Sequence, residues 1–450
     1  MRKPAGSGQD RYTYLTQTPV DKLIVKLAVP TIISMLVTGI YNTADTYFVG
    51  RISTQATAAV GLVFSVMAII QAFGFFCGHG SGNYISRMLG AGETREANEA
   101  ASTGFALALI LGLIFASVGI IFVEPLAVFI GATPTTLADA TTYMRIILLG
   151  APFMMCQFVV NNQLRFQGAA TYAMAGLLCG AILNIFLDPL LILVFHMGVA
   201  GAAIATITGQ AVSFIVLLIG STKGENIRLS VRNVRLNRHY LLEIINGGMP
   251  SLFRQGMASV ATILLNTNAG FYGGDAAIAG MSVVTRITML MCSALIGFGQ
   301  GYQPVCSFNY GAGLKKRVRD GYFFCLKYGT IFLTCAGVLC FLFAPQVVSW
   351  FRADPDVVAV GAFALRCQVC MLPFLTVVFI SNMMLQSIGK GVKASLTSSA
   401  RNGIFFIPLI LLLPRLFGLT GVEITQTCAD VCAVFLAVPL AWSELKKMND

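Results

Sequence analysis

Twelve long apolar segments constrain this chain more than any other feature of its sequence. A membrane-spanning helix needs about 20 mostly apolar residues, and each segment reaches roughly that length. Of the 450 residues, 56% are hydrophobic and only 11% are charged, whereas a soluble protein carries about 25% charged residues. A soluble enzyme of several ordinary domains is therefore excluded. Each segment must be a helix, because hydrocarbon leaves no backbone polar group satisfied in an open strand or loop. The predicted spans are residues 27–49, 57–78, 100–123, 142–162, 171–195, 199–220, 243–268, 276–299, 321–344, 359–383, 394–414 and 420–442.

The basic residues predict how the spans are oriented. Twenty-one Lys and Arg residues lie in the N-terminal tail, in alternate loops and at the C-terminus, the tail among them holding Arg2 and Lys3. The opposite loops hold only Arg51, Arg352 and Arg415. Loops rich in Lys and Arg stay in the cytoplasm, so we expect a multi-pass protein of the plasma (inner) membrane with both termini cytoplasmic. The net charge of +11 then belongs to a membrane face, and we expect no nucleic-acid partner.

The two halves of the sequence repeat at a nearly constant offset. Pro30 matches Pro250, Pro152 matches Pro373, and further Gly and Pro positions follow in the same order. Six helices separate matching positions, so both halves share one orientation, which is a parallel repeat. We therefore predict an N-terminal six-helix lobe at 1–220, a basic cytoplasmic linker at 221–242 and a C-terminal six-helix lobe at 243–450.

Two carboxylates inside the apolar spans are the strongest candidates for chemistry, because an ionisable group in hydrocarbon is costly and marks function by default. Asp45 lies toward the outer end of the first span. Asn184 and Asp188 lie four residues apart in the fifth span and so share a helix face, and Pro189 leaves the carbonyl of Ile185 without its helical donor. Such a face can hold a proton or a small hard cation. Burial favours the protonated carboxyl and a bound cation favours the carboxylate, which is a basis for exchanging one for the other. The alternative is that these carboxyls only hydrogen-bond neighbouring helices or cap a kink.

The second half lacks a matching pair of carboxylates. It carries Arg254, Arg286, Arg366 and Arg401 in or near its spans, with Glu423 and Asp430 in the last span. We expect Arg286 and Arg366 to pair with carboxylates or to reach an interface, and Glu423 to be structural. The glycine-rich tract 76–82 is typical of a helix end or break. No Walker A sequence and no catalytic set of residues is evident, so we expect no enzyme activity and no cofactor.

Several local strings make a resemblance specific. They are Ala44-Asp45-Thr46-Tyr47-Phe48-Val49-Gly50, the tract from Gly82 to Gly92, Leu183-Asn184-Ile185-Phe186-Leu187-Asp188-Pro189, and the tract from Gly198 to Thr206. The order and spacing of these strings resemble those of the multidrug and toxic compound extrusion (MATE) family. The resemblance runs from about residue 20 to 440 and is strongest to prokaryotic members of the MepA-like and DinF-like kind.

The resemblance implies an all-α integral membrane protein whose twelve transmembrane helices form two six-helix lobes around a V-shaped cleft. It implies a monomeric antiporter in the lipid bilayer that exports cationic amphipathic drugs by alternating access, in exchange for H⁺ or Na⁺. By similarity, Asp45, Asn184, Asp188 and Thr206 would form the cation-coupling site, Tyr143 would lie near it, and Asn161 would bind drug. Another branch of the family uses carboxylates in the seventh and tenth helices, where this chain has Arg254 and Arg366. The alternative is a flippase of related fold for a lipid-linked (polyprenyl-phosphate) cargo, which would need a cationic cleft.

Overall fold

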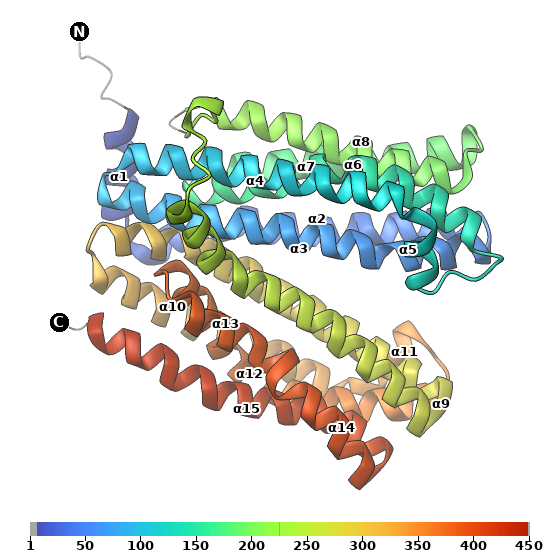
Figure 1. Cartoon of the computed structure of the whole chain (residues 1–450). Helices are drawn as coiled ribbons and strands as arrows, with labels where there is room; N and C mark the ends of the chain where they lie inside the picture. Colours follow the sequence, from blue (N-terminus) through green and yellow to red (C-terminus); the bar gives the residue numbers. More distant parts are fainter. Residues whose placement is uncertain (1–6, 225, 449–450) are drawn as a thin grey trace. The chain divides into compact units, whose positions relative to one another are not determined.

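The computed structural model describes the backbone of residues 7–224 and 226–448, and all side chains within them except those of residues 7–10, 42, 43 and 46. The predicted basic tail residues Arg2 and Lys3 therefore lie outside the described residues. Throughout the described ranges the chain forms helices and no strand (Figure 1). The predicted all-helical class is confirmed.

The chain divides into two compact units. Unit 1 consists of the chain up to Thr18, Val29–Gly248 and Ser307–Gly313, and unit 2 of Pro19–Ala28, Met249–Cys306 and the chain from Leu314 onward. This division does not test the predicted lobe boundaries at 220 and 243, which stay a prediction. The helices of the first half are α1 (Ser7–Gln17), α2 (Val20–Gly50), α3 (Thr54–Ala91), α4 (Thr94–Ile121), α5 (Val123–Phe129), α6 (Leu137–Phe166), α7 (Ala170–Pro189), the π-helix η1 (Leu190–Val194) and α8 (Gly198–Ser221).

The second half follows a short 3₁₀ turn, η2 (Val231–Asn233). Its first element, α9 (Arg238–Gly311), runs for 74 residues, or about 110 Å at 1.5 Å per residue, far more than the roughly 30 Å core of a bilayer. Gly274 interrupts it with φ 66° and ψ −158°, a backbone conformation that glycine adopts without penalty. The remaining elements are α10 (Lys315–Leu342), α11 (Ala344–Phe351), α12 (Pro355–Ser387), α13 (Gly391–Ser399), the π-helix η3 (Ala400–Ile404), α14 (Phe406–Phe417), α15 (Leu419–Leu445) and η4 (Lys446–Met448).

The predicted spans agree with these helices. Within the described ranges, 11 helices are long and apolar enough to cross a membrane. One of them is α9, which holds the two predicted spans 243–268 and 276–299 on either side of Gly274. All twelve predicted spans are therefore helical, and the chain is an integral membrane protein. Three short helices, α1, α5 and α11, were not predicted from the sequence, because none of them has the length of a span.

The glycine-rich tract at 76–82 was predicted to end or break a helix, and this prediction is wrong. It lies inside the continuous helix α3, and its residues are buried. A Cβ on Gly80 would lie 2.2 Å from the carbonyl oxygen of Ile244, and one on Gly82 would lie 2.3 Å from the ring of Phe166. The glycines therefore permit close helix packing rather than a turn, a need that local sequence does not reveal.

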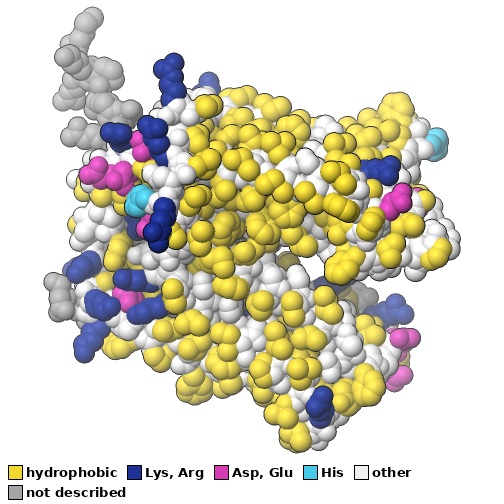
Figure 2. All heavy atoms as spheres, viewed as in Figure 1, with side chains coloured by type: hydrophobic (Ala, Val, Ile, Leu, Met, Phe, Trp, Pro, Cys, Tyr) yellow, Lys and Arg dark blue, Asp and Glu magenta, His cyan; other side chains and the backbone are white. Residues whose placement is uncertain are grey.

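The packing in each unit is organised around one central helix. In unit 1, α6 packs against α3, α4 and α8, and α7 packs along α8. In unit 2, α12 packs against α10, α13 and α15. On the face shown in Figure 2, hydrophobic side chains cover the middle of each unit, and most Lys and Arg side chains gather at one end of it. An apolar band of this kind matches the hydrocarbon core of a bilayer.

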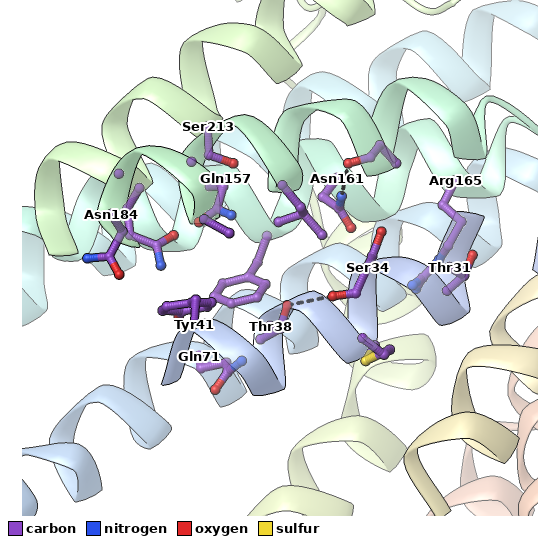
Figure 3. A pocket seen from close by; sticks show the side chains of 18 of the residues that line it. Thr31, Ser34, Thr38, Tyr41, Gln71, Gln157, Asn161, Arg165, Asn184 and Ser213 are labelled. Carbon is purple, nitrogen blue, oxygen red and sulfur yellow. Dashed lines mark hydrogen bonds between the residues drawn. The ribbon is translucent and has the colours of Figure 1, made fainter. Parts of the chain in front are cut away.

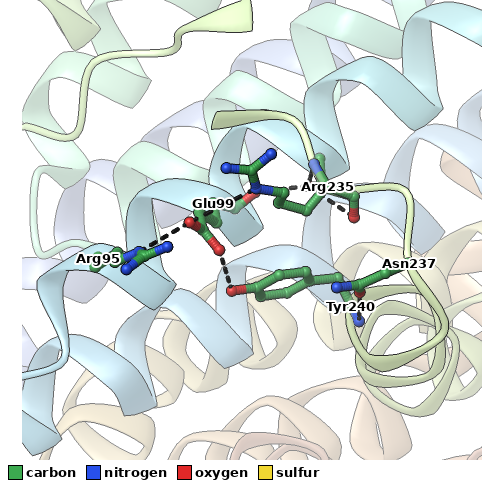
Figure 4. A network of polar contacts seen from close by, with 6 residues as sticks. Arg95, Glu99, Arg235, Asn237 and Tyr240 are labelled. Atoms are coloured by element: carbon green, nitrogen blue, oxygen red, sulfur yellow. Dashed lines mark hydrogen bonds and ion pairs between the residues drawn. The ribbon is translucent and has the colours of Figure 1, made fainter. Parts of the chain in front are cut away.

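The predicted linker is fixed to unit 1 by a polar network (Figure 4). The Glu99 carboxylate accepts hydrogen bonds from the hydroxyl of Tyr240 at 2.8 Å and from Nε of Arg95 at 3.1 Å. Nε of Arg235 lies 3.8 Å from the same carboxylate. Asn237 caps the start of α9 by accepting from the backbone N–H of Tyr240. Arg235 and Tyr240 of the linker thus hold its path against α4 through the carboxylate of Glu99.

Candidate functional site

A cavity of ≈ 80 Å³ lies inside unit 1 among helices α2, α3, α6, α7 and α8. Its wall is mixed, with apolar side chains such as Phe75 and Leu177 beside many polar ones. Figure 3 shows a row of polar side chains, with Asn184 toward one end and Thr31 and Arg165 toward the other. The labelled polar residues of the wall are Thr31, Ser34, Thr38, Tyr41, Gln71, Gln157, Asn161, Arg165, Asn184 and Ser213.

The five residues predicted for the coupling site are all buried and lie close together. Asp188 and Tyr143 are fully buried, and Asp45, Asn184 and Thr206 are at most 4% exposed. Tyr143 of α6 lies beside Thr206 of α8 and interacts electrostatically with Asp45 of α2 and with Asp188 of α7. The two carboxyls also interact with each other. Four different helices therefore bring the predicted residues into one polar cluster next to the cavity, to whose wall Asn184 and Thr206 belong.

The local sequence explains how α7 contributes to this cluster. Asn184 and Asp188 lie one turn apart and are both buried. Directly after Pro189 the chain continues as the π-helix η1. Proline offers no N–H to the carbonyl four residues before it, and π-helical turns are frequent at functional sites. Helix α8 packs closely against α7 at this glycine. A Cβ on Gly180 would lie only 2.5 Å from the carbonyl oxygen of Gly209, so the approach requires a residue without a side chain.

Most polar atoms of the cluster have no hydrogen-bond partner among the described residues. These atoms are both carboxylate oxygens of Asp188, Oδ1 of Asp45, both side-chain polar atoms of Asn184, the hydroxyl of Tyr143 and the hydroxyl of Thr206. Buried polar groups are almost always hydrogen-bonded. This concentration of unpaired oxygens therefore points to a bound proton or cation, which oxygen atoms can hold.

A proton or a small hard cation fits the chemistry of this donor set. Two carboxyl groups, an amide and a hydroxyl supply oxygen ligands, which hard cations prefer. No group of three or more His, Cys, Asp or Glu side chains that could hold a metal ion occurs in the part of the chain that the structure describes. A cation here would therefore depend on the neutral oxygens of Asn184 and Thr206 besides the two carboxylates.

Two further residues of the cluster, Tyr41 and Gln210, were not predicted from the sequence. Tyr41 lies beside Gln210 and interacts electrostatically with Asp45 and Asp188. Tyr41 precedes Asp45 by four residues on α2, and Gln210 follows Thr206 by four residues on α8. Side chains at i and i+4 share a helix face, so helix periodicity applied to the predicted site could have found both.

The predicted drug-binding residue Asn161 lies in the cavity wall. Its side-chain N–H donates to the carbonyl of Ala173 at 3.0 Å, which ties α6 to α7. Arg165 is one of the 21 basic residues that the sequence assigned to the tail, loops and C-terminus, as the single basic residue of the loop after the fourth span. It is instead 3% exposed in the last turn of α6. It donates to Asn162 and to Nε2 of His79. The helix extends one turn further than the apolar run, which is why that assignment was wrong.

Comparison with known proteins identifies the family. The model of the MatE family matches twice, at residues 30–190 and 250–412, and these two matches reproduce the predicted repeat. The chain is 29% identical over 433 residues to the multidrug export protein MepA of Staphylococcus haemolyticus, covering 96% of this chain and 95% of that protein. It is 29% identical to MepA of Staphylococcus aureus over 425 residues, covering 94% of this chain and 93% of that protein.

Solved structures agree with this result. A multidrug resistance MATE family transporter of the MOP superfamily, in an outward-facing conformation, superimposes with a TM-score of 0.91 at 27% identity, covering all of both chains. The chain thus shares the two-lobe fold of such transporters. MATE family multidrug transporters are secondary transporters rather than enzymes. This chain, an integral membrane protein and a secondary transporter, belongs to the MatE family.

Proposed function

We propose that this chain is a cation-coupled multidrug efflux antiporter of the plasma membrane, with both termini in the cytoplasm. It exports amphipathic cationic compounds as a monomer, and its only cofactor-like requirement is the coupling ion, H⁺ or Na⁺. The names of its relatives support multidrug export. They give no support to the alternative of a lipid-linked cargo.

The observation that carries the coupling part is the cluster of unpaired buried oxygens around Asp188 in unit 1. When Asp188 is protonated, one of its oxygens carries an O–H group, which can donate a hydrogen bond to the side-chain oxygen of Asn184 or Thr206. A small cation instead draws the oxygens of Asp45, Asn184, Asp188 and Thr206 together. Since these groups stand on α2, α7 and α8, each ligand changes how the helices beside the cavity pack.

Exchange follows only if the ligands distinguish between conformations. A ligand shifts an equilibrium by its difference in affinity between the two states, and not by tight binding alone. Drug in the cavity near Asn161 and cation at Asp188 would favour different packings of the same helices. In alternating access, that competition drives one ligand outward as the other moves inward.

The test is transport by the purified chain in liposomes. A pH gradient is imposed without sodium, and the movement of ethidium is followed by fluorescence. We expect ethidium to move opposite to the protons and the movement to stop in Asp188→Asn. The matched control is Asp275→Asn, which removes an exposed carboxylate in the same way and should leave export unchanged.

The sodium arm separates the two coupling ions. If a pH gradient drives no movement, the same experiment with a sodium gradient should do so through the same residue. Gel filtration of the purified variant shows whether Asp188→Asn still folds. Full export by a folded Asp188→Asn variant, or no export in either gradient, would overturn the proposal.

A further inference from the structure

A second and larger cavity lies wholly inside unit 2. Its volume is ≈ 330 Å³, within the range of about 300–1,000 Å³ that small-molecule sites occupy. Helices α9, α12, α13, α14 and α15 and the π-helix η3 contribute to it. Much of its wall is apolar, from Leu265, Met289, Ile296, Phe379 and Phe406.

This cavity is the repeat-related counterpart of the cavity in unit 1. Asn161 donates to the carbonyl of Ala173. Asn382, which occupies the position of Asn161 in the second repeat, donates to the carbonyl of Ala394 at 2.6 Å. Both asparagines line their cavities, so the same hydrogen bond frames each one. The two cavities therefore have a common framework, and their linings can be compared position by position.

The comparison shows that the charged residues differ between the two cavities. The alignment that matches Pro30 with Pro250 places Ser34 of unit 1 on Arg254 of unit 2, and the carboxylate Asp45 on Leu265. Further along, the alignment that matches Asn161 with Asn382 places Gly180 on Arg401. Unit 1 thus places two carboxylates beside a cavity whose wall holds one guanidinium group, Arg165. Unit 2 instead places two guanidinium groups, Arg254 and Arg401, in its cavity wall.

One of the two guanidinium groups is already neutralised. Nε of Arg401 lies 2.8 Å from Oδ1 of Asp430, which is 1% exposed and also accepts from Gln426 at 2.9 Å. The partly buried Arg254 differs, since the described residues offer its side chain neither a hydrogen bond nor an ion pair. No carboxylate belongs to the cavity wall within the described chain. The cavity therefore carries about one uncompensated positive charge.

We propose that the unit 2 cavity binds the anionic head group, a carboxylate or a phosphate, of an amphipathic molecule through Arg254. The planar guanidinium group presents paired donors that match two oxygens of either group. The apolar side chains of the same cavity wall accommodate the rest of the molecule. This binding does not depend on the coupling role of Asp188, and it adds an anion-selective site in unit 2 to the cation site proposed in unit 1.

The experiment compares two probes that differ only in charge. The full chain, purified in a nonionic detergent, is titrated with dansylglycine and with its uncharged amide, and binding is followed by fluorescence anisotropy. The wild type should bind the acid more tightly than the amide. Because a hydrogen bond to a charged group is stronger than a neutral one, Arg254→Gln should weaken binding of the acid by about tenfold or more and leave the amide unaffected.

The matched control is Arg366→Gln, which removes an exposed guanidinium group of unit 2 outside the cavity and should change neither affinity. Equal binding of acid and amide by the wild type would overturn the proposal, as would an unchanged acid preference in Arg254→Gln. So would an equal loss in Arg366→Gln. Because no transport is measured, failure here is distinguishable from failure of the ethidium experiment.

A competition arm identifies the source of the head group. Displacement of dansylglycine by phosphatidylglycerol, but not by phosphatidylcholine, would show that an anionic lipid supplies the group. Displacement by neither would assign the site to a smaller amphipathic anion. In both cases the residue that recognises the ligand is Arg254.

Discussion

Removing the guanidinium group of Arg401 should destabilise unit 2 strongly, because it leaves a buried carboxylate almost alone. The Arg401 side chain is 16% exposed and that of Asp430 is 1% exposed, and they form an ion pair at 2.8 Å. In Arg401→Met, Asp430 would keep only its hydrogen bond from Gln426. Breaking a buried pair by removing one partner costs about 3–5 kcal/mol.

That cost translates into a measurable change in melting temperature. For a unit of about 200 residues, each kcal/mol lowers Tm by roughly 2–4 °C, so Arg401→Met should lower Tm by about 6–20 °C. The assay is thermal unfolding in detergent with a thiol-reactive dye, which reports exposure of buried cysteines such as Cys292 and Cys325.

Two further variants test whether the unpaired carboxylate of Asp430 causes the loss of stability. The double variant Arg401→Met/Asp430→Leu removes both charges and should recover most of the lost stability, since replacing a buried pair by apolar residues is often neutral. Glu124→Gln removes one partner of an exposed pair with Arg145, which contributes about 0–1 kcal/mol, and should barely change Tm. If the double variant melted as low as Arg401→Met, the stranded charge would not be the cause.

Two more predictions concern helix packing and the linker. Gly180→Ala should lower Tm in the same assay at a cost of about 1–3 kcal/mol, because its Cβ would meet the carbonyl oxygen of Gly209. Gly61→Ala, whose Cβ meets nothing within 4 Å, should not, and equal melting of the two variants would refute the packing argument. In Glu99→Gln, the hydrogen bond from Tyr240 loses its charged acceptor, at a cost of about 1.5 kcal/mol. The linker should then be open about ten times more often, and trypsin should cleave it about tenfold faster. Cleavage at the wild-type rate would show that the network does not hold the linker.

The fold was largely predictable because the bilayer permits few structures. An apolar run of about 20 residues has to be a helix in hydrocarbon, so twelve runs predicted twelve spans. Packing between helices was not predictable in the same way. The role of Gly80 depends on the carbonyl of Ile244, which lies far away in the sequence, and no local pattern records that approach.

The candidate site was predictable in part for a related reason. Asp45 and Asp188 stand out because charged side chains in apolar spans are rare and costly. Tyr41 and Gln210 did not stand out, since an uncharged polar residue in a helix has many possible roles. The cavity of unit 2 was hidden as well, because Arg254 and Arg401 lie far apart in the sequence and only the fold places both in one wall.

The shared hydrogen bond of the two repeats has a consequence for how such a chain can change. Asn161 with Ala173, and Asn382 with Ala394, join neighbouring helices through the backbone in each unit. The charged residues that differ between the two cavities take no part in these bonds. The framework and the specificity are therefore separable, so that substitutions at single wall positions can retune what one half accepts. In a chain with two repeated lobes, one lobe can therefore acquire a new ligand while the other lobe keeps its own.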